Sequence, residues 1–142
     1  MQRQDRLIQV ISKFSQAMKS YIIGEFSRKG INATPTQAAI LYLLEQKDGR
    51  KISDFASSLE IKNSAMTGVI DRMEKSGLII RKLDPSDRRI ISIHITPHGR
   101  EISSKAKSIV RKMNEKIESG LSEQEIEICK KVLAHLHEKI KV

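Results

Sequence analysis

The chain has 142 residues, of which 39% are hydrophobic, a length that supports one domain with its own core and leaves little room for a second. Its 26 Lys and Arg side chains outnumber its 17 Asp and Glu side chains, and the net charge of +9 favours a polyanionic partner, either a nucleic acid or an anionic membrane surface. No segment has the roughly 20 consecutive apolar residues of a membrane span, and the amino terminus lacks the apolar run of a secretory signal, so we expect a cytoplasmic protein.

Two helices are predicted in the first third of the chain. The first runs from Leu7 to about Phe26, because apolar residues recur there every three or four positions, at Leu7, Ile11, Phe14, Met18, Tyr21 and Ile22. The second begins with a capping box in which Thr34 is the N-cap, Pro35 is the first helical residue and Gln37 follows three residues after the cap.

Residues 53–77 predict two shorter helices joined by a tight turn. The apolar positions of this pair are Phe55, Ala56 and Leu59 in the first helix and Met66, Val69, Ile70 and Met73 in the second. With those side chains buried, the opposite face of the second helix carries small and polar residues, namely Asn63, Ser64, Thr67, Gly68, Asp71, Arg72 and Lys75. A face of this kind fits the major groove of duplex DNA.

A β-hairpin is predicted immediately after these helices. Gly77 is placed to close the helix in the left-handed conformation, and the first strand begins within residues 78–80. In the second strand isoleucine alternates with polar residues, which predicts a buried inner face of Ile91, Ile93 and Ile95. Asp84 and Asp87 are explained better as turn formers than as catalytic carboxylates.

Two further amphipathic helices complete the chain. Thr96 and Pro97 repeat the cap-then-proline start, and an apolar stripe follows at Ile102, Ala106, Ile109, Met113 and Ile117. After a break at Ser119 and Gly120, the last helix has a coiled-coil-like spacing of apolar residues, at Ile126, Cys129, Leu133, Leu136 and Ile140.

A second copy of the chain is expected to cover these helices. Three Phe, two Tyr and no Trp supply little aromatic bulk for covering three long amphipathic helices within one chain. The predicted dimer interface consists of Leu7, Ile11, Ile126, Cys129, Leu133, Leu136 and Ile140.

The sequence offers little support for a redox, metal or catalytic site. Cys129 lies on the apolar stripe between Ile126 and Leu133, which favours inert packing over the approachable thiol of a peroxide sensor. The four histidines are scattered, and no phosphate-binding glycine loop, nucleophile elbow or catalytic carboxylate pair is present. We therefore expect no metal, no cofactor and no enzymatic activity.

Several short motifs stand at fixed intervals within residues 64–99: Gly77-Leu78, Asp84-Pro85, Asp87-Arg88-Arg89 and Thr96-Pro97-His98-Gly99. With these motifs, and over essentially its whole length, the chain resembles the MarR family of winged-helix transcription regulators. The resemblance implies a homodimer with one winged helix-turn-helix lobe per chain. We accordingly expect a mainly α fold with a small β-hairpin wing (α+β), as one domain over residues 1–142, in which residues 34–96 form the lobe and residues 5–28 and 97–142 form dimerisation helices.

The candidate DNA contacts lie mainly on the second helix of the helix-turn-helix pair, which follows the turn near residue 62. Base contacts are expected from Asn63, Ser64, Thr67 and Gly68, and phosphate contacts from Ser53, Lys62, Arg72 and Lys75. Asp71 is expected to orient Arg72 or a neighbouring arginine. Glycine costs about 1 kcal/mol relative to alanine inside a helix, and at position 68 either close approach of a groove wall or drift at an exposed site explains it. Lys62 stands where the family commonly has a Ser or Thr cap, so we expect Asn63 or Ser64 to cap the helix and the helix to begin later.

At the hairpin turn, Arg88 and Arg89 are expected to enter the adjacent minor groove, where narrow A/T-rich segments concentrate negative potential. The resemblance implies that Arg89 makes this contact and that Asp87 steadies it.

We therefore expect a sequence-specific, nucleoid-associated DNA-binding regulator, a repressor that acts as a homodimer on a pseudo-palindromic operator. The resemblance further implies release by a small-molecule or redox signal, with an effector pocket near Phe14, Met18, Tyr21 and Leu41, although an ordinary core would use the same side chains. The alternatives are a basic winged-helix module that binds RNA and a protein-interaction module that no longer binds nucleic acid.

Overall fold

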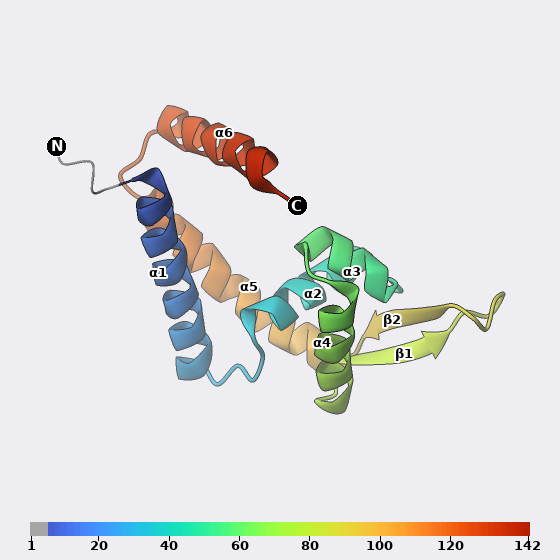
Figure 1. The fold of residues 1–142 in the computed structure, drawn as a ribbon. Coiled ribbons are helices and arrows are strands. Elements are labelled where there is room, and N and C mark those ends of the chain that lie inside the picture. Colours follow the sequence, from blue (N-terminus) through green and yellow to red (C-terminus); the bar gives the residue numbers. More distant parts are fainter. Residues whose placement is uncertain (1–5) are drawn as a thin grey trace. The chain divides into compact units, whose positions relative to one another are not determined.

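The computed structural model describes residues 6–142, which form six helices and one two-stranded hairpin (Figure 1). The elements in chain order are α1 (Leu7–Arg28), α2 (Pro35–Gln46), α3 (Ile52–Leu59), α4 (Asn63–Lys75), β1 (Ile79–Leu83), β2 (Ile91–Ile95), α5 (Pro97–Glu118) and α6 (Glu123–Ile140). The mainly α fold with a hairpin wing, predicted from the sequence, is confirmed. The chain divides after Ile109 into two compact units, so that α5 begins in the first unit and ends in the second.

Side-chain caps fix the beginnings of three helices. Thr34 Oγ1 accepts the Gln37 N–H at 3.1 Å and Gln37 Oε1 accepts the Thr34 N–H at 3.1 Å, which confirms the predicted capping box. Thr96 Oγ1 accepts the Gly99 N–H at 3.0 Å at the start of α5. A second capping box, in which Ser122 is the cap and Glu125 its partner, begins α6 and lowers the pKa of the Glu125 carboxyl through those hydrogen bonds.

The core of the first unit is formed by one apolar face from each of its elements. Side chains with no or almost no exposed surface come from α2, α3, α4, the connection before β1 and the hairpin, and they are Ile40, Leu41, Leu44, Phe55, Met66, Ile70, Met73, Leu78, Ile79 and Ile93. Phe26 of α1 and Ile102, Ala106 and Ile109 of α5 complete this core. Burial of an aliphatic side chain of this size stabilises the fold by roughly 1.5–3 kcal/mol, so the apolar spacing of the sequence is the main determinant of the arrangement.

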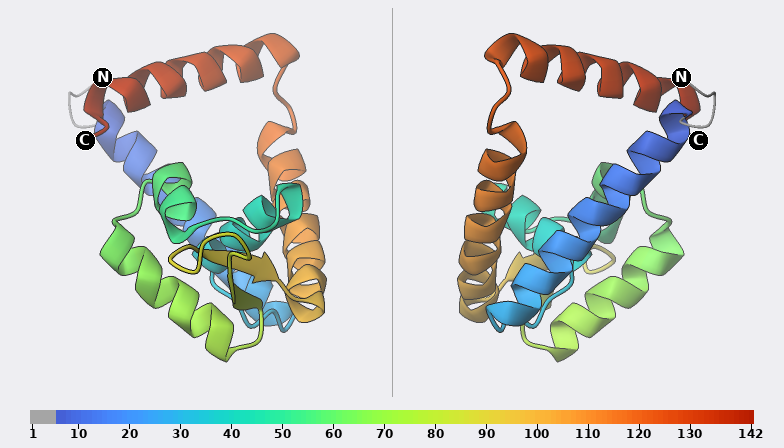
Figure 2. Two further views of the ribbon diagram at one scale, coloured as in Figure 1. Left: turned by 90° about the vertical axis from the view of Figure 1, so that its right-hand side faces the viewer. Right: turned by 90° about the vertical axis from the view of Figure 1, so that its left-hand side faces the viewer.

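The hairpin, which we call the wing (residues 79–95), extends outward from this core. Seen end-on in Figure 2 (left), it lies in front of the core and close to α3 and α4. Its strands pair antiparallel, with Ile79 opposite Ile95 and Leu83 opposite Ile91. These four side chains share one face because alternate residues of a strand point the same way.

The prediction of a buried isoleucine face is wrong at its outer end. Ile93 and Ile95 are buried, but Ile91 is 45% exposed and its partner Leu83 is 59% exposed, because the wing continues past the edge of the core. Leu78, expected at the start of the first strand, is buried just before β1 begins.

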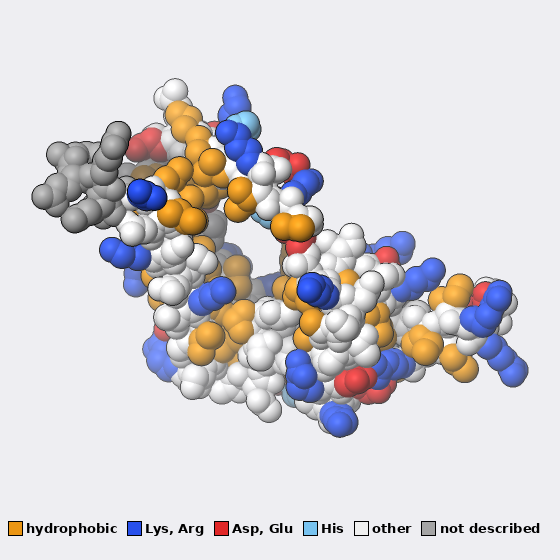
Figure 3. All heavy atoms as spheres, in the orientation of Figure 1, with side chains coloured by type: hydrophobic (Ala, Val, Ile, Leu, Met, Phe, Trp, Pro, Cys, Tyr) orange, Lys and Arg blue, Asp and Glu red, His pale blue; other side chains and the backbone are white. Residues whose placement is uncertain are grey.

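Apolar side chains are exposed along α1 and, separately, along α6 (Figure 3). On α1 they include Leu7, Ile11 and Phe14, and on α6 no residue is buried. Cys129 is exposed within the single chain, so its predicted inert packing depends on a second copy and stays a prediction.

We expect Gly99→Ala to destabilise the first unit by roughly 1–3 kcal/mol, because the inserted methyl group has no space. A Cβ at this position would lie 2.2 Å from the Leu78 carbonyl oxygen and 2.9 Å from Ile95 Cγ1. Urea unfolding followed by circular dichroism measures the change. The control is Gly24→Ala in α1, where an added Cβ would meet no atom within 4 Å and where alanine should be neutral or stabilising by up to about 1 kcal/mol. Equal effects of the two substitutions would contradict this account of the α5 contact.

Candidate nucleic-acid interface

The polar face of α4 points away from the core. Met66, Ile70 and Met73 are completely buried, and the rotation of the helix that buries them leaves the other side in solvent. Asn63, Ser64, Thr67, Arg72 and Lys75 are all exposed on that side, and Gly68 is half-buried. The structure therefore brings the residues predicted for base contact together on one continuous surface.

The helix begins earlier than predicted. Lys62 is its N-cap, with no side-chain hydrogen bond at the cap, and Asn63 is the first helical residue. The Asn63 carbonyl already accepts the Thr67 hydroxyl at 3.0 Å, and the Lys62 carbonyl accepts the Met66 N–H at 2.9 Å. The expected cap at Asn63 or Ser64 is therefore wrong, because burial of Met66 sets the start of the helix and overrides the missing cap residue. The first backbone N–H groups of α4 remain available to an acceptor outside the chain.

Gly68 is not required by packing within the chain. A Cβ there would find Arg72 Nη1 at 3.5 Å, which is ordinary van der Waals contact. Both interpretations of this glycine, close approach of an external group and drift, remain consistent with the structure.

The remaining predicted phosphate contacts lie at the starts of helices. Ser53 is exposed in the first turn of α3, and Lys62 is exposed at the start of α4. The α3 start is fixed by Asp54, whose carboxylate accepts the Lys51 N–H at 3.1 Å.

The wing turn is formed by Asp84. Its Oδ1 accepts the Ser86 N–H at 2.8 Å, the Ser86 hydroxyl at 2.6 Å and the Asp87 N–H at 3.2 Å. The Ser86 hydrogen bonds hold the pKa of the Asp84 carboxyl below its ordinary value. The predicted role of Asp84 as a turn former is confirmed.

Asp87 holds the guanidinium of Arg89 at the end of the wing. Asp87 Oδ1 accepts Arg89 Nε at 3.1 Å and Asp87 Oδ2 accepts Nη2 at 3.1 Å, while the Arg89 N–H also binds Oδ1 at 3.0 Å. These contacts lower the pKa of the Asp87 carboxyl, the side-chain hydrogen bond from Arg89 being the largest cause. Because the Arg89 side chain is 90% exposed, the pair adds little to stability, and its effect is to orient the guanidinium. Arg88 is exposed beside it.

A contact that the sequence did not predict anchors the base of the wing. Asp48, in the connection between α2 and α3, accepts the Ile95 N–H through Oδ1 at 2.9 Å and lies 3.2 Å from His94 Nδ1 through Oδ2. His94 Nε2 lies 2.9 Å from the Ser92 hydroxyl. The backbone next to Asp48 adds to this anchor, because the Arg50 carbonyl accepts the Ile93 N–H at 2.7 Å.

A second unpredicted contact joins the wing to α4. Arg81 of β1 binds Asp71 Oδ1 through Nη2 at 2.5 Å and Glu74 Oε1 through Nη1 at 2.7 Å. The expectation that Asp71 orients a neighbouring arginine is met by Arg81. Local patterns gave no signal for this contact, since it depends on how the hairpin folds back along the helix.

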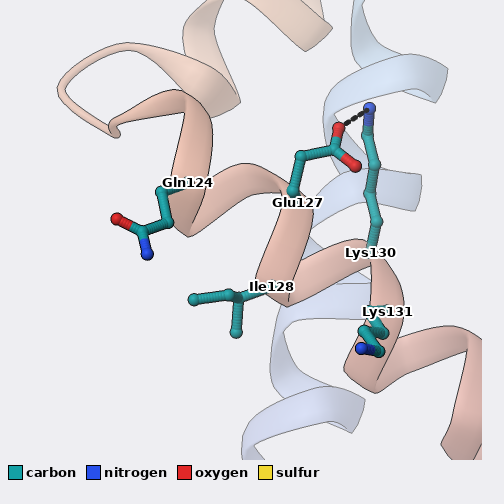
Figure 4. Close-up of a pocket in the computed structure, with 5 residues that line it drawn as sticks. All are labelled: Gln124, Glu127, Ile128, Lys130 and Lys131. Carbon is teal, nitrogen blue, oxygen red and sulfur yellow. Dashed lines mark hydrogen bonds and ion pairs between the residues drawn. The ribbon is translucent and has the colours of Figure 1, made fainter.

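The predicted effector residues have different environments. Leu41 is completely buried in the core, whereas Met18 and Tyr21 are half-buried and Phe14 is exposed on α1. The structure has an open surface hollow elsewhere, along one side of α6 (Figure 4), and its lining residues are Gln124, Glu127, Ile128, Lys130 and Lys131. This hollow contains none of the residues predicted for an effector.

Within residues 6–142, no group of three or more His, Cys, Asp or Glu side chains is arranged to hold a metal ion. No helix in the same range combines the length and the apolar character that crossing a membrane requires.

Comparisons with known proteins agree with this geometry. The family model described as the MarR family matches residues 33–91. The chain is 32% identical to the uncharacterised HTH-type transcriptional regulator YkoM of Bacillus subtilis, over 85% of this chain and 79% of that protein. It is 27% identical to the HTH-type transcriptional regulator MhqR of the same organism, over 90% and 87% of the two chains. The structure of MepR from S. aureus in complex with DNA has the same fold, with a TM-score of 0.87, 24% identity and coverage of 97% of this chain and 99% of that one.

We expect Asp48→Ala to lower the free energy of unfolding by about 1–3 kcal/mol, because the Ile95 N–H loses its acceptor in a partly buried position. Asp48→Asn is the matched control, since its amide oxygen can still accept that hydrogen bond, and it should cost less. Chemical denaturation compares the two variants. If Asp48→Asn is as destabilising as Asp48→Ala, the Ile95 hydrogen bond is not what anchors the wing.

Proposed function

The chain belongs to the MarR family of winged helix-turn-helix transcriptional regulators, and from this premise we propose that it binds a pseudo-palindromic operator as a homodimer and represses transcription. The observation that supports this proposal best is the joint placement of two features in the first unit. The polar face of α4 is exposed, and Arg89 lies in the turn of the wing, whose strand β1 contacts α4, so one lobe can address a major groove and the adjacent minor groove together.

The exposed face of α4 supplies the proposed major-groove contacts. Asn63, Ser64 and Thr67 carry side chains that can donate or accept hydrogen bonds at base edges, and Gly68 allows close approach of the groove wall. The surrounding Ser53, Lys62, Arg72 and Lys75 are proposed to bind phosphates, which adds affinity and fixes the register of the lobe without reading sequence.

The wing supplies the proposed minor-groove contact. Arg89 is the inserted side chain, and Arg88 adds positive charge beside it. Asp87 keeps the guanidinium in one orientation before DNA arrives, which reduces the conformational entropy lost on binding.

The exposed apolar faces of α1 and α6 support the proposed dimer. They contain Leu7, Ile11, Cys129, Leu133 and Ile140, all exposed in the single chain. Exposed apolar surface on this scale is typical of a surface that another chain covers. Two-fold symmetry then places the half-sites about 10 base pairs apart, with a dissociation constant on the order of 10⁻⁸ to 10⁻¹¹ M for the operator.

Control by a small-molecule or redox signal belongs to the same proposal. The signal would change the separation of the two lobes, and its site would lie near Phe14, Met18, Tyr21 and Leu41.

Selection of bound duplexes from a random DNA pool tests the symmetry of the proposed complex. We expect enriched sequences to be pseudo-palindromes with half-site centres about 10 base pairs apart, and light scattering to give the mass of a dimer. A monomer, or a preference for RNA over every duplex in competition, would contradict the proposal.

We expect Arg89→Ala to weaken operator binding by about tenfold or more, because the cation proposed to enter the minor groove is lost. Folding and dimer mass should be unchanged, because the exposed ion pair between Arg89 and Asp87 contributes little to the stability of the fold. Fluorescence anisotropy with the selected duplex measures the affinity. Arg28→Ala is the control, since Arg28 is an exposed arginine that pairs with Glu25 on α1 and is not among the residues proposed to contact DNA. An affinity for Arg89→Ala equal to that of this control would remove the wing from the interface.

A further inference from the structure

Two carboxylates lie on the helix that is proposed to enter the major groove. Asp71 and Glu74 belong to α4 and are exposed. DNA carries one negative charge per about 1.7 Å of helix axis, and charges interact over a Debye length of about 10 Å at 0.1 M salt. Unpaired carboxylates on this helix would therefore oppose the attraction that Arg72 and Lys75 provide.

Arg81 contacts both carboxylates with one guanidinium. It binds Asp71 through Nη2 and Glu74 through Nη1, and its own backbone N–H donates to Glu74 Oε2 at 3.2 Å. The Arg81 side chain is 25% exposed, less than either carboxylate. These contacts, and above all the hydrogen bond to Asp71, raise the pKa of Arg81, so the charge that neutralises the two carboxylates is permanent.

We propose that Arg81 is a positioning residue for DNA binding, whose function is to neutralise Asp71 and Glu74 and to hold them back against β1. The inference rests on the DNA binding proposed above. It assigns to Arg81 an effect on affinity that needs no contact between Arg81 and DNA. The side chain also joins α4 to the wing, so the test must separate charge neutralisation from mechanical attachment.

Four proteins separate these roles: the wild type, Arg81→Gln, the double variant D71N/E74Q, and the triple variant D71N/E74Q/R81Q. The affinity of each for the selected duplex is measured by fluorescence anisotropy between 50 and about 300 mM salt. We expect Arg81→Gln to bind about tenfold more weakly at the lowest salt, and this deficit to shrink as salt screens the exposed carboxylates. The triple variant should recover to within about threefold of the wild type although it lacks Arg81, and the double variant should bind at least as tightly as the wild type.

Other outcomes overturn the inference. If the triple variant binds as weakly as Arg81→Gln, Arg81 acts by attachment or by touching DNA, and charge neutralisation is wrong. If Arg81→Gln has the wild-type affinity, Arg81 has no role in binding. Unfolding curves of all four proteins show whether Arg81→Gln has lost stability as well as affinity. If the loss of structure causes the loss of affinity, the triple variant, which also lacks Arg81, would not regain the wild-type affinity.

Arg28→Gln is the matched control, because it removes one guanidinium from an ion pair that lies on α1 and not on α4. It should leave the affinity unchanged at every salt concentration. If the wild type binds no duplex, the proposed function itself is wrong. If the wild type binds but the triple variant does not recover, only the role proposed for Arg81 is wrong, so the two failures are distinguishable.

Discussion

The orientation of α4 depends on the burial of three side chains on one of its faces. Met66, Ile70 and Met73 have no exposed surface, and together they fix the rotation of the helix about its axis. A rotation of one residue would expose an apolar side chain, at a cost of roughly 1.5–3 kcal/mol, and would turn Thr67 toward the core. The same packing therefore forms the core and orients the polar face of α4 toward solvent, so no further contact is needed to expose that face.

The wing needs additional contacts because its outer half has no core beneath it. Asp48 holds the β2 end at Ile95, Arg81 ties β1 to α4, and the Thr96 hydroxyl donates to the Gly77 carbonyl at 2.6 Å at the junction with α5. All three contacts lie nearer to the core than the turn does. Arg89 is consequently carried by a hairpin that is fixed at its base and exposed at its tip, which suits a side chain that must reach a partner outside the protein.

Local sequence signals predicted most of the fold and part of the site. The capping box at Thr34, the turn at Asp84 and the alternation of β2 at Ile93 and Ile95 all act over two or three residues, and the structure confirms them. The Asp48–His94 contact spans 46 residues, and no local pattern encodes it. The prediction that Ile91 is buried was wrong for a related reason. Alternation shows which face of the strand a side chain is on, but not how far the core extends beneath that face.

The division of the chain after Ile109 separates the surfaces that the proposed function requires. The polar face of α4 and the whole wing belong to the first unit, whereas the apolar seam of α6, with Ile126 and Leu133, belongs to the second. Helix α5 begins in one unit and ends in the other, so it is the continuous element between them. The buried stripe of Ile102, Ala106 and Ile109 packs the first half of α5 into the core of the first unit, so this half of the helix belongs to the same body as α4 and the wing.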